Sequence, residues 1–112
     1  MPQDEKRTKQ FLTQAVDQAL LTLGESAREA VYFHLQKIVS LTKDDVSDNL
    51  DTFEKGLEKI FGAGAKMIEI AVVKSLCQQL GIEFEEKKNI SLVDYVNWAI
   101  EKAKAKETIS PA

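Results

Sequence analysis

The chain has 112 residues, of which 44% are hydrophobic and 29% are charged, and its formal net charge at pH 7 is −3. This length predicts one domain over residues 1–112, with an ordered core from about residue 5 to residue 106 and short polar tails. The acidic balance argues against a general attraction to nucleic acid or anionic lipid. No apolar run approaches the ~20 residues of a membrane span, and the polar N-terminus lacks the apolar core of a signal peptide. We therefore expect no membrane association and a cytoplasmic location.

Two amphipathic helices are predicted before residue 40. The first runs from about Glu5 to Thr22, because apolar residues recur there at three- and four-residue spacing, and Gly24 stops it. The second follows Ser26, an N-cap residue with Glu29 three positions later, and runs to about Val39. Its expected inner stripe is Ala27, Ala30, Val31, His34, Leu35 and Ile38.

The pattern breaks between residues 40 and 49, where one short helical turn is expected over Thr42–Val46. A third helix starts near Asp51 and ends at Gly62–Gly64. Its inward residues are predicted to be Phe53, Leu57, Ile60 and Phe61.

The fourth predicted helix, from about Ala65 to Leu80, is apolar around most of its girth, which is typical of a central helix. Its only polar strip consists of Lys66, Glu69, Lys74 and Gln78. Gly81 ends this helix, and a charged connector over Ile82–Asn89 follows. Ser91 then caps a fifth helix, from Leu92 to about Lys106. No strand pattern competes, so we predict an all-α orthogonal bundle of about five helices.

Two groups of residues occur in a fixed order along the chain. The first is Leu23–Arg28 with Ala30, Val31, Tyr32, His34 and Leu35, and the second is Phe53, Leu57, Ile60–Gly62, Gly64–Lys66, Ile68, Glu69 and Lys74. Together they resemble the two signatures of the Nitrosopumilus output domain type, a family of small archaeal helical domains, over about Leu12 to Trp98. The chain departs from the pattern at Ala63, where proline is common. The resemblance implies a helical domain, either stand-alone or the last domain of a signalling protein, with no established activity and no site residues to carry over.

The chain has one histidine and one cysteine, which limits its chemistry. His34 is expected to form a hydrogen bond at a helix interface, with pH sensing or ligand contact as the alternative. Cys77 is expected to be a buried, inert thiol, because the C-terminal end of a helix opposes a thiolate. We predict no catalytic residue, no cofactor and no metal ligand, although carboxylate pairs formed across helices stay open.

Two short motifs resemble ligand loops and fail in detail. In the EF-hand registers that start at Asp44 or Asp45, the last position is Lys55 or Gly56 in place of glutamate. The segment Gly62–Lys66 has a glycine turn and a lysine, but it lacks the spacing and the preceding strand of a phosphate loop. We interpret the first as a solvated acidic loop and the second as a tight corner between helices.

Tyr95 and Trp98 lie three residues apart beside the apolar stripe of the last helix, so they either form a partner surface or close the rim of the core. The favoured function is a non-enzymatic interaction or regulatory module that binds a protein partner or a second copy. The alternatives are a nucleic-acid-associated protein, for which Lys102, Lys104 and Lys106 are the only basic cluster, and a small-ligand or metal-binding protein.

Overall fold

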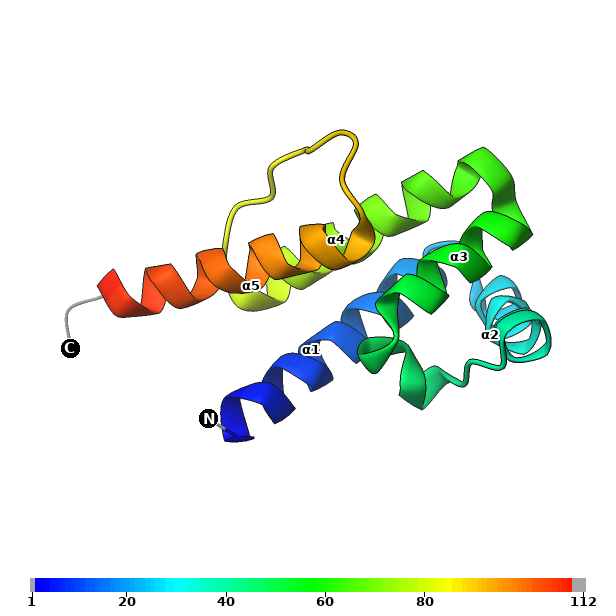
Figure 1. Cartoon of the computed structure of the whole chain (residues 1–112), viewed down its shortest axis with the longest axis horizontal. Coiled ribbons are helices and arrows are strands. Elements are labelled where there is room, and N and C mark those ends of the chain that lie inside the picture. Colours follow the sequence, from blue (N-terminus) through cyan, green and yellow to red (C-terminus); the bar gives the residue numbers. More distant parts are fainter. Residues whose placement is uncertain (1, 110–112) are drawn as a thin grey trace.

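The computed structural model describes the backbone of residues 2–109 and the side chains of residues 6–106. It confirms the predicted all-α bundle, and no strand occurs within the described backbone. Between residues 2 and 109, five α-helices and two 3-10 turns follow one another (Figure 1). In order they are α1 (Pro2–Leu21), α2 (Glu25–Val39), η1 (Lys43–Asp48), α3 (Leu50–Phe61), η2 (Gly62–Gly64), α4 (Ala65–Leu80) and α5 (Leu92–Ile109).

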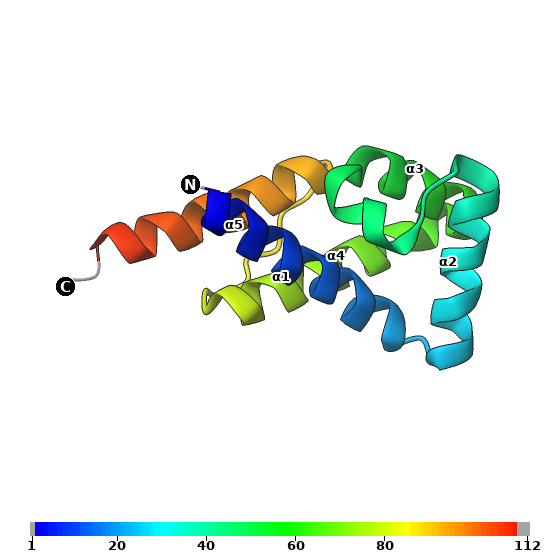
Figure 2. The same cartoon turned by 90° about the horizontal axis from the view of Figure 1, so that it is seen from below.

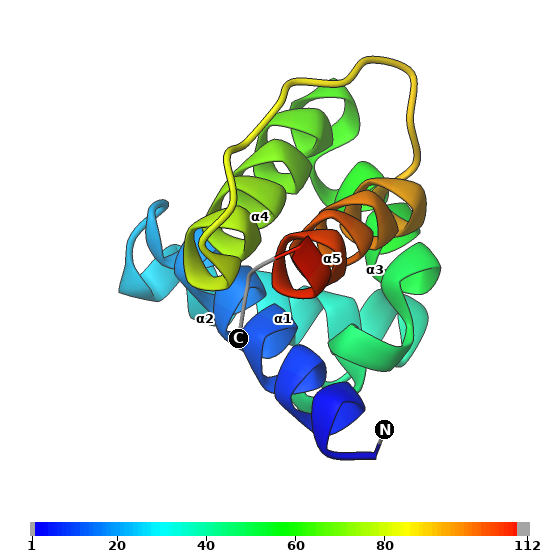
Figure 3. The ribbon, with the colours of Figure 1, turned by 90° about the vertical axis from the view of Figure 1, so that its left-hand side faces the viewer.

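Helix α4 is central, as its apolar girth predicted, because it packs against α1, α3 and α5. Its contact with α1 is the most extensive helix pair of the bundle. Helix α2 crosses one end of the molecule, where it packs on α1 and α3 (Figure 2). Seen from the other end, the connector between α4 and α5 passes over the outer side of these two helices (Figure 3). Within the part of the chain that the structure describes, one long side of α2 therefore has no neighbouring helix (Figure 2).

The helix ends agree with the sequence in part. Gly81 caps α4 in a left-handed conformation (φ 70°), and Ser91 Oγ accepts a hydrogen bond from the N–H of Asp94, so both predictions are confirmed. The predicted cap at Ser26 is wrong, because α2 already begins at Glu25 and Gly24 is its N-cap residue. Gly24 has a φ of 105°, and this positive value lets the chain turn sharply from α1 into α2.

Helix α2 is held in one rotational orientation by contacts with both of its neighbours. Towards α1, Asp17 accepts hydrogen bonds from Arg28 Nη1 (3.1 Å) and from Tyr32 Oη (3.0 Å). Towards α3, Leu35 and Val39 lie against Gly56, whose lack of a side chain lets the two helices approach closely. Because both contacts are specific, the remaining side of α2 has to face solvent.

Asp17 is the polar anchor of this arrangement. Its burial acts to raise its pKa, but the hydrogen bond from Tyr32 and the charges of Lys43 and Arg28 outweigh this effect, so the pKa lies below its usual value. Burial and the neighbouring carboxylate raise the pKa of Tyr32, which therefore stays a neutral hydrogen-bond donor. Asp17 is thus an anion that joins α1, α2 and η1.

The predicted inner stripe of α2 is wrong for three of its residues. Val31 and Leu35 are buried as expected, but Ala30, His34 and Ile38 are exposed. The hydrophobic period alone could not set the rotation of α2, because the contacts of Arg28 and Tyr32 with Asp17 turn a different face towards α1. His34 is therefore a surface histidine and not an interface residue.

Candidate functional site

Exposed apolar side chains gather at α2. Four large hydrophobic residues are exposed among the described side chains, and three of them, Leu23, Phe33 and Ile38, lie on α2 or immediately before it. Phe33 is 56% exposed and Ile38 is 42% exposed. The fourth, Met67, lies in the first turn of α4 and is 76% exposed. Among these residues Phe33 is the aromatic one, and an exposed aromatic side chain is a candidate anchor for a partner.

Phe33 lies at the centre of the side of α2 that faces solvent. Glu29 and Lys37 stand one helical turn before and after it, and Ala30 lies on the same side. All four residues are exposed. We call Glu29, Ala30, Phe33, His34 and Lys37 the α2 outer face; Ile38 is exposed outside it, five residues after Phe33 and therefore on a different side of the helix.

The ring of Phe33 already has two contacts within the α2 outer face. The His34 ring meets it edge-on, with ring centroids 5.8 Å apart and an interplanar angle of 71°. Lys37 Nζ lies 5.1 Å from the centroid of the Phe33 ring. These contacts leave more than half of the Phe33 side chain exposed, so a partner can cover it.

A second group of interest is a carboxyl cluster that joins α3 and α4. Glu54 and Glu58 stand one turn apart on α3, and Glu69 lies on α4; one oxygen from each comes within 4.8 Å of the others. The sequence placed Glu69 on a polar strip, but the structure buries it to 4% exposure. Spacing along one helix could not reveal this cluster, because Glu69 is brought to the other two only by tertiary packing.

Glu69 holds a proton near neutral pH. Its burial, the hydrogen bond with Glu54 and the charge of Glu54 together raise its pKa to about 7, against the weaker opposing effect of Lys66. Glu54 in turn accepts a hydrogen bond from the backbone N–H of Leu92, the first residue of α5 (3.2 Å). Glu54 therefore connects three helices, through its hydrogen bond with Glu69 of α4 and its hydrogen bond from the start of α5.

Three carboxylates are a donor set that suits a hard divalent cation. Here Lys66 Nζ lies 3.7 Å from Glu69 Oε1, and Glu54 is already engaged with the start of α5. The ammonium group of Lys66 and the proton held between Glu69 and Glu54 already offset part of the negative charge of these carboxylates. The three carboxyl groups therefore form a hydrogen-bonded cluster between α3 and α4, which Glu54 links to the start of α5.

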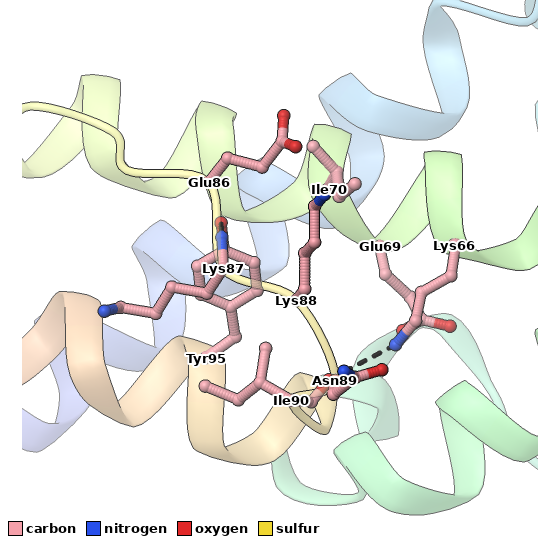
Figure 4. Close-up of a pocket in the computed structure, with 9 residues that line it drawn as sticks. All are labelled: Lys66, Glu69, Ile70, Glu86, Lys87, Lys88, Asn89, Ile90 and Tyr95. Carbon is pink, nitrogen blue, oxygen red and sulfur yellow. Dashed lines mark hydrogen bonds and ion pairs between the residues drawn. The ribbon is translucent and has the colours of Figure 1, made fainter.

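Glu69 also borders a cavity of about 260 Å³ between α4 and the connector. Figure 4 shows Lys66 and Glu69 on one side of this cavity, with Lys88, Asn89 and Ile90 of the connector facing them. Lys66 Nζ donates a hydrogen bond to the carbonyl of Ile90 (3.2 Å) across it. The cavity thus lies beneath a connector that is itself tied to α4.

Tyr95 holds the same connector to α5. Its hydroxyl donates to the carbonyl of Glu85 (2.5 Å) and accepts from the N–H of Lys87 (3.0 Å). Its side chain is only 3% exposed, so of the two alternatives that the sequence left open, Tyr95 belongs to the core. Burial raises the pKa of its phenol, which keeps the hydroxyl protonated as a donor.

Removal of the Tyr95 hydroxyl should loosen the connector. In Tyr95→Phe the carbonyl of Glu85 and the N–H of Lys87 lose their partner, and we expect the free energy of unfolding to fall by about 1 kcal/mol. Amide hydrogen exchange followed by NMR should show faster exchange at Lys87. Tyr32→Phe is the matched control, because it removes a half-buried, hydrogen-bonded hydroxyl elsewhere and should leave exchange at Lys87 unchanged. Unaltered exchange at Lys87 in Tyr95→Phe would contradict the anchoring role.

Trp98 is half-buried against the core, and two lysines cover its ring. Lys87 Nζ and Lys102 Nζ lie 5.0 Å and 5.1 Å from the ring centroid, and Lys102 also pairs with Glu85 (2.6 Å). The partner-surface prediction for Trp98 stays a prediction, with the ring shielded by these side chains.

Cys77 is buried as predicted, and burial raises the pKa of its thiol.

Comparisons with protein-family models, with curated proteins and with solved structures gave no match. The resemblance to the Nitrosopumilus output domain type therefore stays a prediction. Among the described residues, no helix is both long enough and apolar enough to cross a membrane.

Proposed function

We propose that this chain is a cytoplasmic, non-enzymatic protein-interaction module that binds its partner through the α2 outer face. The observation that carries the proposal is the 56% exposure of Phe33 on a helix whose opposite side is fixed by Asp17 and Gly56. An exposed aromatic side chain on a rigid helix is the kind of anchor that contributes most to binding energy at protein interfaces.

The lysines of α5 support this proposal over the nucleic-acid alternative. Lys102 pairs with Glu85 and covers Trp98, and Lys106 Nζ donates a hydrogen bond to the carbonyl of Gly81. These two cations are therefore engaged within the molecule and not arranged as a phosphate-binding stripe. The net charge of −3 also disfavours binding to nucleic acid.

The positions of the two most reactive residue types support a non-enzymatic role. His34 is exposed on α2, whereas Cys77 is buried in α4 with a protonated thiol. A buried thiol with a raised pKa is a poor nucleophile. A single unpaired cysteine also fits a reducing cytoplasm.

The test is a capture experiment from a lysate of the source organism with the tagged wild-type chain, Phe33→Asp and Met67→Asp. Phe33→Asp places a charge at the centre of the α2 outer face and should reduce stoichiometric capture at least about tenfold. Met67→Asp is the matched control, because Met67 is the most exposed large hydrophobic residue among those described and lies on a different helix. Wild-type and Met67→Asp chains should capture the same protein.

Circular dichroism should show that both variants keep the helical content of the wild type, because both side chains are exposed. Equal capture by Phe33→Asp and the wild type would overturn the assignment of the surface. Capture that disappears after nuclease treatment would favour the nucleic-acid alternative instead.

A further inference from the structure

The α2 outer face is self-complementary in charge. Glu29 precedes Phe33 by four residues and Lys37 follows it by four, so opposite charges stand at equal distances on either side of the aromatic ring. Within the described side chains, Glu29 makes no ion pair, and Lys37 only lies over the Phe33 ring. Both charges are therefore available to a molecule that covers this face.

We propose that the partner of the α2 outer face is a second copy of this chain, with the two α2 helices antiparallel about a twofold axis at Phe33. This inference rests on the proposed function and names the partner. In such a pair the two Phe33 rings meet at the axis, and each Glu29 faces Lys37 of the other copy. A twofold axis uses the same patch on both molecules, so one surface has to match itself, and this one does.

Steric and electrostatic features of α2 suit the antiparallel arrangement. Ser26 and Ala30, both small and exposed, lie on the same side as Phe33 and permit a close approach of the two helices. Antiparallel alignment also brings the positive end of each helix dipole beside the negative end of the other. A parallel arrangement would place Glu29 against Glu29 and Lys37 against Lys37, which costs free energy through like-charge repulsion.

The pairing should be weak, because one helix face covers less than the ~1,200 Å² at which stable interfaces begin. We expect a dissociation constant on the order of 100 µM. Sedimentation equilibrium of the purified chain at low salt, from about 10 µM to about 1 mM, should therefore show a rising average mass.

Charge exchange tests the geometry of the pair. Glu29→Lys alone and Lys37→Glu alone each create two like-charge contacts, and each should weaken self-association about tenfold. A mixture of the two single variants should form mixed dimers, because both lysines of one molecule then face glutamates of the other. The double variant Glu29→Lys with Lys37→Glu should restore self-association. Both substituted positions are exposed, so the variants should fold as the wild type does.

The outcomes separate this inference from the proposed function. A wild-type chain that stays monomeric up to about 1 mM overturns the self-pairing, and so does a mixture that associates no better than either single variant. If Phe33→Asp nevertheless loses a captured protein, the α2 outer face still binds a different partner and the proposed function stands. If Phe33→Asp changes neither capture nor self-association, both ideas fail together.

Discussion

Replacement of Glu69 by glutamine should stabilise the protein above pH 7 by on the order of 3 kcal/mol. The neutral amide can donate a hydrogen bond to Glu54, as the protonated carboxyl group of Glu69 does, and it never ionises in the buried position. The wild-type carboxyl group, by contrast, has to lose its proton inside the protein as the pH passes about 7. Urea unfolding from pH 4 to pH 9 measures the difference.

The direction of the pH dependence follows from the raised pKa. Between the ordinary value of 4.5 and about 7, the folded state holds a proton that the unfolded state has lost, so the stability of the wild type falls as the pH rises. Glu69→Gln should lack this decline and match the wild type near pH 4. Glu58→Gln is the control, because Glu58 belongs to the same cluster but is exposed, and its effect should be a few tenths of a kcal/mol. Equal slopes for the wild type and Glu69→Gln would show that Glu69 does not hold the shared proton.

Alanine at position 56 should destabilise the bundle by about 2 kcal/mol, although alanine favours a helix over glycine by about 1 kcal/mol. A Cβ atom at Gly56 would overlap Leu35 Cδ2 and would lie only 3.2 Å from Val39 Cγ2. Leu35 is completely buried, so it cannot move aside without displacing its neighbours. Thermal unfolding should show a fall in Tm of several degrees.

Gly64→Ala is the matched control for the same substitution outside a tight contact. Its Cβ would lie 3.7 Å from Phe61 Cβ, an ordinary van der Waals distance, at a backbone φ of −67°. This variant should be as stable as the wild type or slightly more stable. If Gly56→Ala proved equally harmless, α2 could shift on α3, and the orientation of the α2 outer face would not be fixed by this contact.

The sequence was sufficient for the helices and for their limits within a few residues. Apolar spacing predicted α1 to α5, Gly81 and Ser91 marked two helix ends, and the apolar girth of α4 predicted its central place. These features are local, because the hydrophobic period and the capping residues act within one or two turns of the chain. Sequence also predicted the burial of Cys77 for a local reason, namely its position on an apolar helix.

Only the tertiary structure decided which sides of the helices are buried and which polar groups meet. The hydrogen bonds from Arg28 and Tyr32 to Asp17, which lies on a different helix, orient α2 so that His34 and Ile38 face solvent. Glu69 is a surface residue by sequence pattern, yet α3 and the start of α5 enclose it beside Glu54. Tyr95 can be buried because its hydroxyl forms hydrogen bonds with the backbone of Glu85 and Lys87 in the connector. The hydrophobic period of α5 does not indicate these partners. Each of these outcomes depends on contacts between residues far apart in the chain, and a pattern along one helix carries no information about them.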